Sequence, residues 1–274
     1  MHQIGIIQGR LTQVKDGKIQ SFPSDNWENE FFSAEKIGFT LIEWVLDEDS
    51  LDHNPVLTSE GRARISELSK QTGVEVKSIC CDNFMVLPLS AKDDAIRNES
   101  QRVLFDLIDH AGEVGIDLIE LPLIGVSALE DQHNYDYMVN FFHQIKDRLQ
   151  QKKMKLLLEV SIPPKAITKL LEDIGMDEIQ INYDTGNSAY WSFDTTEEMQ
   201  CYGNEIGNVH IKDCTPADYS VDLGKGNVDF DLFFDWLKKL NYRGDFILQA
   251  VRGEDDIAIA QTFFDFTKKY VGML

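Results

Sequence analysis

Four side chains that can bind a metal ion or move a proton end short apolar segments in the second half of the chain. They are Glu159, Asp184, His210 and Gln249, and each follows the previous one by about one strand–helix unit or slightly more. Two carboxylates, an imidazole and an amide oxygen suit a divalent ion such as Mn²⁺, Mg²⁺, Co²⁺ or Zn²⁺. Each residue alone has a structural explanation, as a helix cap, a turn residue or a hydrogen-bonded core histidine. The four together favour a metal site.

The elements that must position these residues are short β-rich segments alternating with amphipathic helices. Several of the segments are nearly continuous apolar runs, which is typical of parallel strands buried on both faces. The expected strands are 4–7, 41–44, 76–79, 118–121, 155–159, 179–183, 209–211 and 246–249. The expected helices are 58–72, 94–114, 135–153, 165–174, 230–240 and 255–270.

This alternation, without a linker or an internal repeat, predicts an α/β protein with a single (β/α)₈ TIM barrel domain over residues 1–274. In such a barrel the carboxyl ends of the strands carry the chemistry. The long segments 8–30 and 80–93 would lie on that face. Consecutive strands would then bring the four candidate ligands to one rim.

Other polar residues at strand ends are candidates for contacting a substrate. They are Gln8, Arg10, Glu43, Glu120 and Arg252 as substrate-binding residues, Lys212 as a catalytic residue beside Glu159, and Asp82 as a further polar residue after the third strand. Lys212 lies two residues after His210 and therefore shares its face of the strand. Each of these residues also has an ordinary structural explanation, such as a surface ion pair for Arg10 or Arg252.

The composition excludes several classes of protein. The net charge of −21 opposes binding to nucleic acid, although a few local cations can still hold one anionic group. No apolar run reaches the length of a membrane span, and no signal peptide is evident, so we expect a cytoplasmic protein without a membrane partner. Cys80 and Cys81 are adjacent, which suits neither a metal pair nor a disulfide framework.

Six stretches in order along the whole chain resemble the xylose isomerase-like superfamily, which includes sugar phosphate isomerases and epimerases and endonuclease IV. They are IGIIQGRL (4–11), LE (158–159), YDTGN (183–187), VHIKD (209–213), LGKGNVDF (223–230) and YRGDFILQ (242–249). The resemblance implies a divalent metal held by Glu, Asp, His and Glu on the fifth to eighth strands. It also implies a small carbohydrate substrate, with or without a phosphate group, and a homo-oligomer. Asn187 would then hold the ligating groups in place, and Asp213 would either orient a ligand or cap the next turn.

One residue departs from the family pattern, because Gln249 stands where the family usually has glutamate. An amide oxygen can ligate a metal, but an amide cannot accept or deliver a proton at neutral pH. The family's epimerases use two glutamates on opposite faces of the substrate. With Gln249, a shuttle by Glu159 alone would support aldose–ketose isomerisation, unless Glu43, Glu120 or Glu254 supplied the second acid. We therefore expect a metal-dependent isomerase or epimerase of a sugar or sugar phosphate, which forms an enediolate by removing a proton α to a carbonyl.

The same fold is compatible with three functions other than sugar isomerisation. A DNA-repair endonuclease would need several zinc ions and more histidine ligands than the six histidines here provide, and the acidic charge opposes it. A lyase that dehydrates polyols or keto-inositols would start with the same proton abstraction. A sugar-binding barrel with a degraded metal site would explain Gln249 as decay, and such a protein would gain no stability from Mn²⁺.

Overall fold

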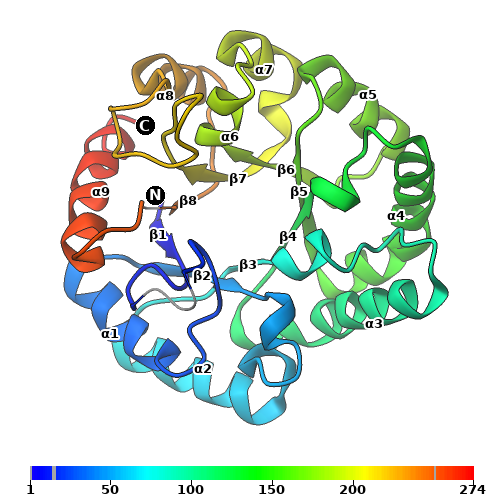
Figure 1. Ribbon diagram of the computed structural model, residues 1–274, viewed down its shortest axis with the longest axis horizontal. Coiled ribbons are helices and arrows are strands. Elements are labelled where there is room, and N and C mark those ends of the chain that lie inside the picture. Colours follow the sequence, from blue (N-terminus) through cyan, green and yellow to red (C-terminus); the bar gives the residue numbers. More distant parts are fainter. Residues whose placement is uncertain (1, 14–16, 250) are drawn as a thin grey trace.

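The computed structural model describes residues 2–13, 17–249 and 251–274. Its strands form a closed parallel barrel in sequence order, β1 to β8, surrounded by helices (Figure 1). The strands are β1 (Ile4–Ile7), β2 (Leu41–Val45), β3 (Ser78–Cys80), β4 (Leu118–Leu123), β5 (Lys155–Val160), β6 (Ile179–Asp184), β7 (Ile206–Ile211) and β8 (Phe246–Leu248). The predicted (β/α)₈ barrel is confirmed.

Capping residues mark where helices begin and end, as in α2. Thr58 caps α2 by accepting a hydrogen bond from the Gly61 N–H, and Gly73 ends that helix with a positive φ of 74°. The helices are α1 (Trp27–Ile37), α2 (Ser59–Thr72), α3 (Asp94–His110), α4 (Gln132–Lys152), α5 (Pro164–Ile174), α6 (Thr185–Tyr190), α7 (Thr195–Tyr202), α8 (Phe230–Lys239) and α9 (Asp256–Val271). Short 3₁₀ turns lie at Glu48–Ser50, Pro55–Leu57, Asp82–Met85, Ala111–Val114, Gly125–Ser127 and Gly203–Glu205.

Three helices were not expected from the sequence. Helix α1 begins at Trp27, so its first turn lies inside the segment 8–30 that we expected on the face at the carboxyl ends of the strands. Helix α6 has only six residues, too few to show a hydrophobic period, and it follows directly on Asp184. Helix α7 is short as well. The expected helix 94–114 divides into α3 and a 3₁₀ turn, because the chain tightens before Gly115.

The main apolar core lies between the strands and the surrounding helices. Outward residues of the strands, such as Trp44 and Phe246, pack there with aromatic residues from the helices. A separate small apolar cluster consists of Ile7, Leu41, Val45, Cys80 and Ile247, which point into the barrel. Much of the remaining barrel interior is polar, and that polar interior continues into the site described below.

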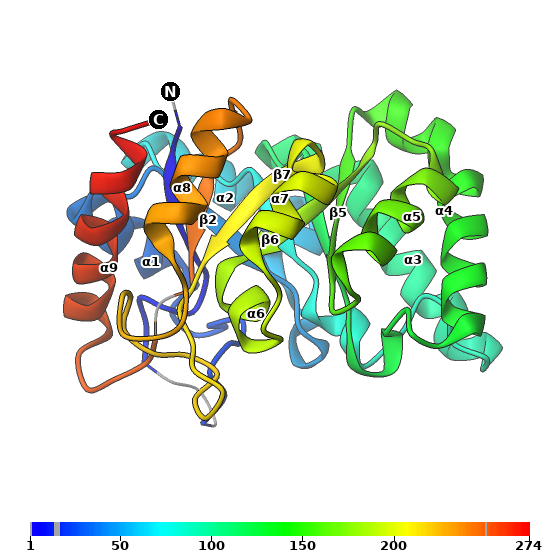
Figure 2. The same ribbon diagram turned by 90° about the horizontal axis from the view of Figure 1, so that it is seen from above.

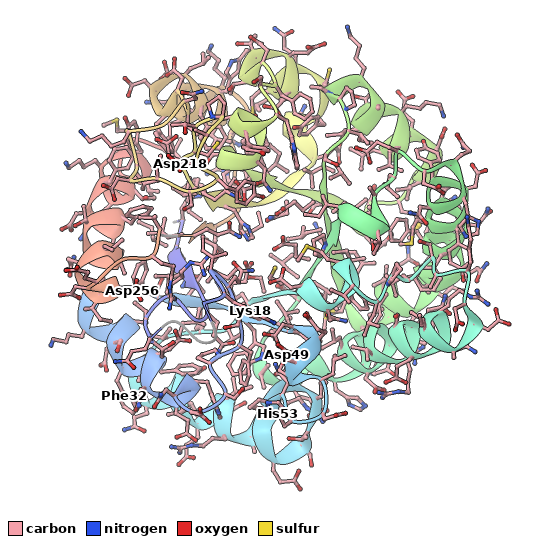
Figure 3. All side chains as sticks on the ribbon, viewed as in Figure 1. Lys18, Phe32, Asp49, His53, Asp218 and Asp256 are labelled. Carbon is pink, nitrogen blue, oxygen red and sulfur yellow. The ribbon has the colours of Figure 1, made fainter. Side chains whose placement is uncertain are left out.

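The loops after the strands gather at one end of the barrel, the lower end in Figure 2. Lys18 in the β1–α1 loop pairs with Asp49 after β2, with 2.5 Å between Nζ and Oδ2, and thereby joins two of these loops (Figure 3). The long connection between β7 and α8, which contains Asp218, lies at the same end.

None of the helices in the described ranges is long and apolar enough to cross a bilayer. All four cysteines are free, in agreement with the absence of a disulfide framework in the sequence.

Candidate active site

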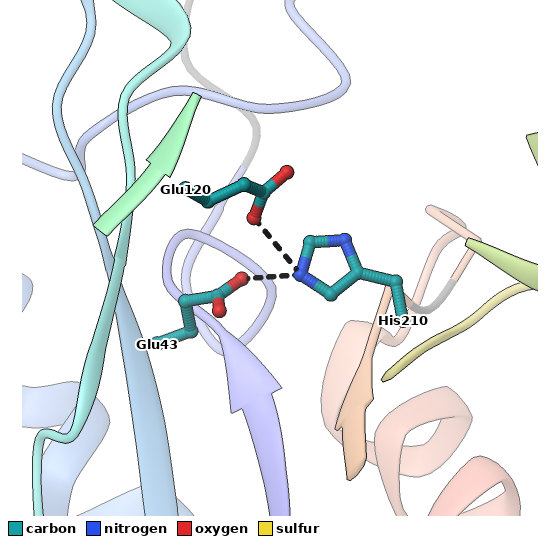
Figure 4. A group of neighbouring side chains, drawn as sticks. All are labelled: Glu43, Glu120 and His210. Atoms are coloured by element: carbon teal, nitrogen blue, oxygen red, sulfur yellow. Dashed lines mark hydrogen bonds and ion pairs between the residues drawn. The ribbon is translucent and has the colours of Figure 1, made fainter. Parts of the chain in front are cut away.

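His210 is the centre of a fully buried cluster inside the barrel. Its Nε2 lies 2.6 Å from Glu43 Oε1 and 3.2 Å from Glu120 Oε2, between the two carboxylates (Figure 4). Its other ring nitrogen, Nδ1, lies 3.0 Å from the Gln249 amide nitrogen and 3.8 Å from Glu159 Oε2. In the neutral ring that donates Nε2–H to Glu43, Nδ1 carries the electron pair and accepts a hydrogen bond from the Gln249 amide nitrogen, on the side of Glu159.

Glu159, Asp184 and His210 converge as the sequence predicts. Each offers one ligand atom, and these atoms lie within 4.8 Å of one another. Asp184 and His210 are also direct partners in the register of β6 and β7. Asp184 Oδ1 caps α6 by accepting from the Asn187 N–H, whereas its buried Oδ2 lies 3.1 Å from the ammonium nitrogen of Lys212. Two carboxylates and an imidazole nitrogen around one point fit a divalent cation.

Amide side chains from β6, β7 and α6 hold the Glu159 carboxylate in place. Asn187 Nδ2 donates to Oε1 at 2.7 Å, and Asn182 Nδ2 donates to Oε2 at 3.2 Å. Asn208 then donates to both Asn182 Oδ1 and Glu43 Oε2. Asn182 and Asn208 were missed in the sequence, although each lies two residues before a predicted ligand and therefore shares its inward face. Asn187 was predicted to support the ligands, and its contact agrees with that prediction.

The acids of this cluster hold their protons more tightly than usual. Burial raises the pKa of Glu159 well above its ordinary value, and the charges of Glu120 and Asp184 raise it further. Burial likewise raises the pKa of Glu120. Burial opposes a charge on His210, but the carboxylates of Glu120 and Glu43 nevertheless raise its pKa well above the ordinary range. A divalent ion that binds here must therefore displace protons.

A cavity of about 280 Å³ opens onto this cluster from the loop end of the barrel. Glu159, Asp184 and Gln249 lie in its wall, together with Arg10, Gln20, Cys80, Asp82, Glu120, Asn187, Lys212, Tyr219 and a few apolar side chains. Such a small cavity, rich in polar groups that converge on one point, suits a small polyhydroxylated ligand better than a large apolar one.

The sequence from α1 into α9 agrees with this geometry. A model of the xylose isomerase-like TIM barrel family matches residues 31–270. The chain belongs to that family. The resemblance of the six sequence stretches is thereby confirmed at the level of the family.

Named relatives of this xylose isomerase-like barrel are epimerases. The chain is 29% identical over 233 residues to the L-ribulose-5-phosphate 3-epimerase UlaE of Salmonella typhimurium, covering 81% of each protein. A solved structure of L-ribulose 3-epimerase aligns with a TM-score of 0.78 at 19% identity, over 100% of this chain and 95% of that one. The IOLI protein, solved with a bound zinc atom, aligns with a TM-score of 0.74 at 15% identity, over 98% and 99%. At such identities the structural likeness establishes the fold. Epimerases are isomerases, so these names agree with the predicted enzyme class.

Lys212, predicted to be catalytic, lies beside the candidate ligands Glu159, Asp184 and His210. Its Nζ is 3.1 Å from Asp184 Oδ2 and 2.7 Å from Asn187 Oδ1, and it sits 3.9 Å from the centre of the Tyr219 ring. Burial opposes the charge, but Asp184, Tyr219 and Glu159 raise the pKa of Lys212 above its ordinary value. Lys212 is therefore a permanent cation in the wall of the cavity.

The remaining predicted substrate contacts divide into two groups. Arg10 and Glu120 line the cavity, and burial together with the nearby Arg252 lowers the pKa of Arg10 to about 10. The other residues are not in the cavity wall. Gln8 Oε1 accepts from the Val45 N–H, Glu43 holds His210, and Arg252 donates to the backbone carbonyls of Gly9 and Thr12.

Asp213 organises a loop instead of touching a predicted metal ligand. Its carboxylate accepts hydrogen bonds from the backbone N–H groups of Cys214, Gly224, Gly226 and Val228, at 2.8 to 3.1 Å. These bonds fold the connection between β7 and α8, which carries Tyr219 over Lys212. Asp213 therefore contributes to the cavity indirectly, by fixing the loop that places Tyr219 in the cavity wall.

Glu30 of α1 has a similar role in the β1–α1 loop. Its fully buried carboxylate accepts from the N–H of Gly9 at 2.9 and 3.0 Å and from the N–H of Leu11 at 3.0 Å. These bonds hold the backbone on both sides of Arg10. Burial raises the pKa of Glu30 to about 7, although the backbone bonds, Arg252 and Arg10 oppose this.

We predict that Glu30 makes the protein lose stability as the pH rises. Because its folded pKa lies above the ordinary value of 4.5, its contribution is complete below about pH 4.5 and is lost as the pH passes about 7. The loss should be on the order of 3 kcal/mol. Urea unfolding of wild type and Glu30→Gln at pH 5 and pH 8 should show this difference, with exposed Glu35→Gln as the matched control. Equal pH dependence in wild type and Glu30→Gln would contradict it.

Proposed function

We propose that this protein is a divalent-metal-dependent isomerase or epimerase of ketoses or ketose phosphates, in which Glu159 removes a proton α to the carbonyl. The observation that carries the proposal is the convergence of Glu159 and Asp184, which line the cavity, with the fully buried His210 behind them. A carboxylate beside a metal site is suited to take a carbon-bound proton from a hydroxyketone held there.

Each residue has a separate task in this proposal. Asp184, His210 and one carboxylate oxygen of Glu159 would hold the cation, with Gln249 beside them. The other oxygen of Glu159 would take the proton. A divalent cation bound there would polarise the carbonyl and stabilise negative charge on its oxygen. Asn182 and Asn187 orient the Glu159 carboxylate, and burial makes it a stronger base once it is ionised. The fixed positive charge of Lys212 favours the negative charge that develops on the substrate oxygen.

The relatives support the class of substrate. The UlaE proteins act, by name, on a ketose phosphate, and the aligned structures include a ketose epimerase with D-allulose bound and a protein with bound zinc. The part of the cavity wall that the structure describes contains one arginine and one lysine, which suits either a free ketose or its phosphate. A lyase acting on keto-inositols would use the same first step.

The proposal is tested by hydrogen exchange in D₂O. Chelator-stripped protein is given Mn²⁺, Co²⁺, Mg²⁺ or Zn²⁺ and incubated with ketopentoses, ketohexoses and their phosphates. We expect metal-dependent entry of deuterium at the carbon next to the carbonyl, followed by NMR. A metal-dependent rise in melting temperature should accompany it. The absence of both effects with every ion would support the sugar-binding barrel instead, and loss of water from a keto-inositol would support the lyase.

A further inference from the structure

The replacement of a glutamate by Gln249 raises the question of which group returns the proton in an epimerisation. An epimerase needs one group to remove the proton from one face of the carbon and a second group to deliver a proton to the other face. The Gln249 amide cannot do this. Within residues 2–13, 17–249 and 251–274, the carboxylic acids in the wall of the cavity are Asp82, Glu120, Glu159 and Asp184.

Three of the acids considered for this task are engaged elsewhere. Asp184 caps α6 and pairs with Lys212. Glu120 lies against the Nε2 of His210. Glu43 is hydrogen-bonded to His210 and is not part of the cavity wall. Glu254, which we also considered from the sequence, is exposed and outside the cavity.

Asp82 is free of these constraints. It follows β3 and begins the short turn Asp82–Met85, so a rigid strand end fixes its backbone. Its Oδ2 accepts from Gln20 Nε2 at 2.7 Å, and its Oδ1 accepts from the Cys80 thiol at 3.3 Å. Both neighbours line the cavity too, and neither is charged at neutral pH.

We propose that Asp82 is the second proton-transfer group of this site and takes the task that Gln249 cannot perform. The inference rests on the proposed function, and it assigns the chain to two-sided epimerisation instead of a shuttle by Glu159 alone. The supporting geometry is that Asp82, which follows β3, and Glu159, which lies in β5, line the same small cavity. A sugar that fills the cavity contacts both carboxyl groups.

The ionisation of Asp82 suits this task. Burial raises its pKa to about 6, and the charge of Glu159 contributes in the same direction, against the hydrogen bonds from Gln20 and Cys80. An acid with this pKa is present in both its protonated and its ionised form near neutral pH, which is the condition for efficient acid–base catalysis.

The proton transfers balance as follows. Ionised Glu159 takes the proton from the carbon α to the carbonyl, and the C–H electron pair forms the C=C bond of an enediolate while the carbonyl electrons move to oxygen. Protonated Asp82 then delivers its proton to the opposite face of that carbon, and the oxygen electrons restore the carbonyl. Glu159 ends protonated and Asp82 ionised, and exchange with water resets both groups.

The experiment compares two rates in D₂O for wild type, Asp82→Asn and the exposed control Asp52→Asn. The first rate is deuterium entry into the substrate with unchanged configuration, and the second is formation of the epimer. We expect Asp82→Asn to keep the Glu159-dependent exchange and to lose at least about a hundredfold in epimer formation. Asp82→Glu, which keeps a carboxyl group, should retain more epimerisation than Asp82→Asn.

A second variant makes the assignment specific. Adding Gln249→Glu to Asp82→Asn should restore epimer formation, because it returns a carboxyl group to the family position. Epimer formation at the wild-type rate in Asp82→Asn would overturn the role of Asp82 while leaving the proposed function intact. No exchange with any sugar in the wild type would overturn the proposed function and the role of Asp82 together.

Discussion

Replacing Glu159 by glutamine should lower turnover by at least about a thousandfold, because it removes the proposed base together with one metal ligand. Glutamine keeps the size of the side chain and one acceptor oxygen for Asn187 Nδ2, which lies 2.7 Å from Oε1 in the native protein. The folded structure should therefore persist. Deuterium exchange into a ketose and the Mn²⁺-dependent rise in melting temperature provide two independent measurements of the loss.

The control for this substitution is Glu172→Gln, an exposed acid on α5, which removes one carboxyl group far from the cavity. It should leave both measurements unchanged. If Glu159→Gln exchanged deuterium at the native rate, another base would have to start the reaction. If it kept the full thermal response to Mn²⁺, Glu159 would not be a ligand.

Replacing Lys212 by methionine should destabilise the metal-free protein by about 3 to 5 kcal/mol, the range found when one partner of a buried ion pair is removed. The Lys212 and Asp184 side chains are only 5% and 1% exposed, and their charged atoms are 3.1 Å apart. Methionine fills a similar volume but leaves the Asp184 carboxylate without a cation. Urea unfolding of chelator-stripped protein measures the loss.

A metal ion should recover much of this stability, because a divalent cation on Asp184 restores the missing positive charge. The melting-temperature rise on adding Mn²⁺ should thus be larger for Lys212→Met than for wild type. The double variant Lys212→Met/Asp184→Asn should lose less than the sum of the two single changes, since it leaves no unpaired charge. Simple additivity would show that the two residues do not form an energetic pair.

The barrel and its rim could be predicted because both depend on local periodicity. Apolar runs alternate with amphipathic helices, and the polar residue at the end of each run marks the rim. This placed Glu159, Asp184 and His210 correctly, and the structure brings them together. Asp184 also caps α6. Its Oδ1 accepts the capping hydrogen bond, which leaves Oδ2 as the oxygen available to a cation.

What the sequence could not supply are contacts between side chains of distant strands. Nothing local shows that His210 turns Nε2 toward Glu43 and Glu120, or that Asn208 connects Asn182 with Glu43. Asp213 was expected to support a ligand, but its four backbone bonds organise a loop, and this depends on how residues 214–228 fold back. Helix α6 is too short for its pattern to be seen.

The polar interior of the barrel sets a limit on how stable this enzyme can become while it stays active. Barrel interiors are usually filled by branched apolar side chains, whereas here Glu43, Glu120, Asn182, Asn208 and His210 fill much of the space. Well-packed apolar replacements of buried polar groups are often neutral or stabilising. A variant with an apolar interior would thus gain stability and lose the proton transfer that we propose, so selection for that activity would keep the protein below its attainable stability. Stabilising changes that spare function are to be sought on the outer helices.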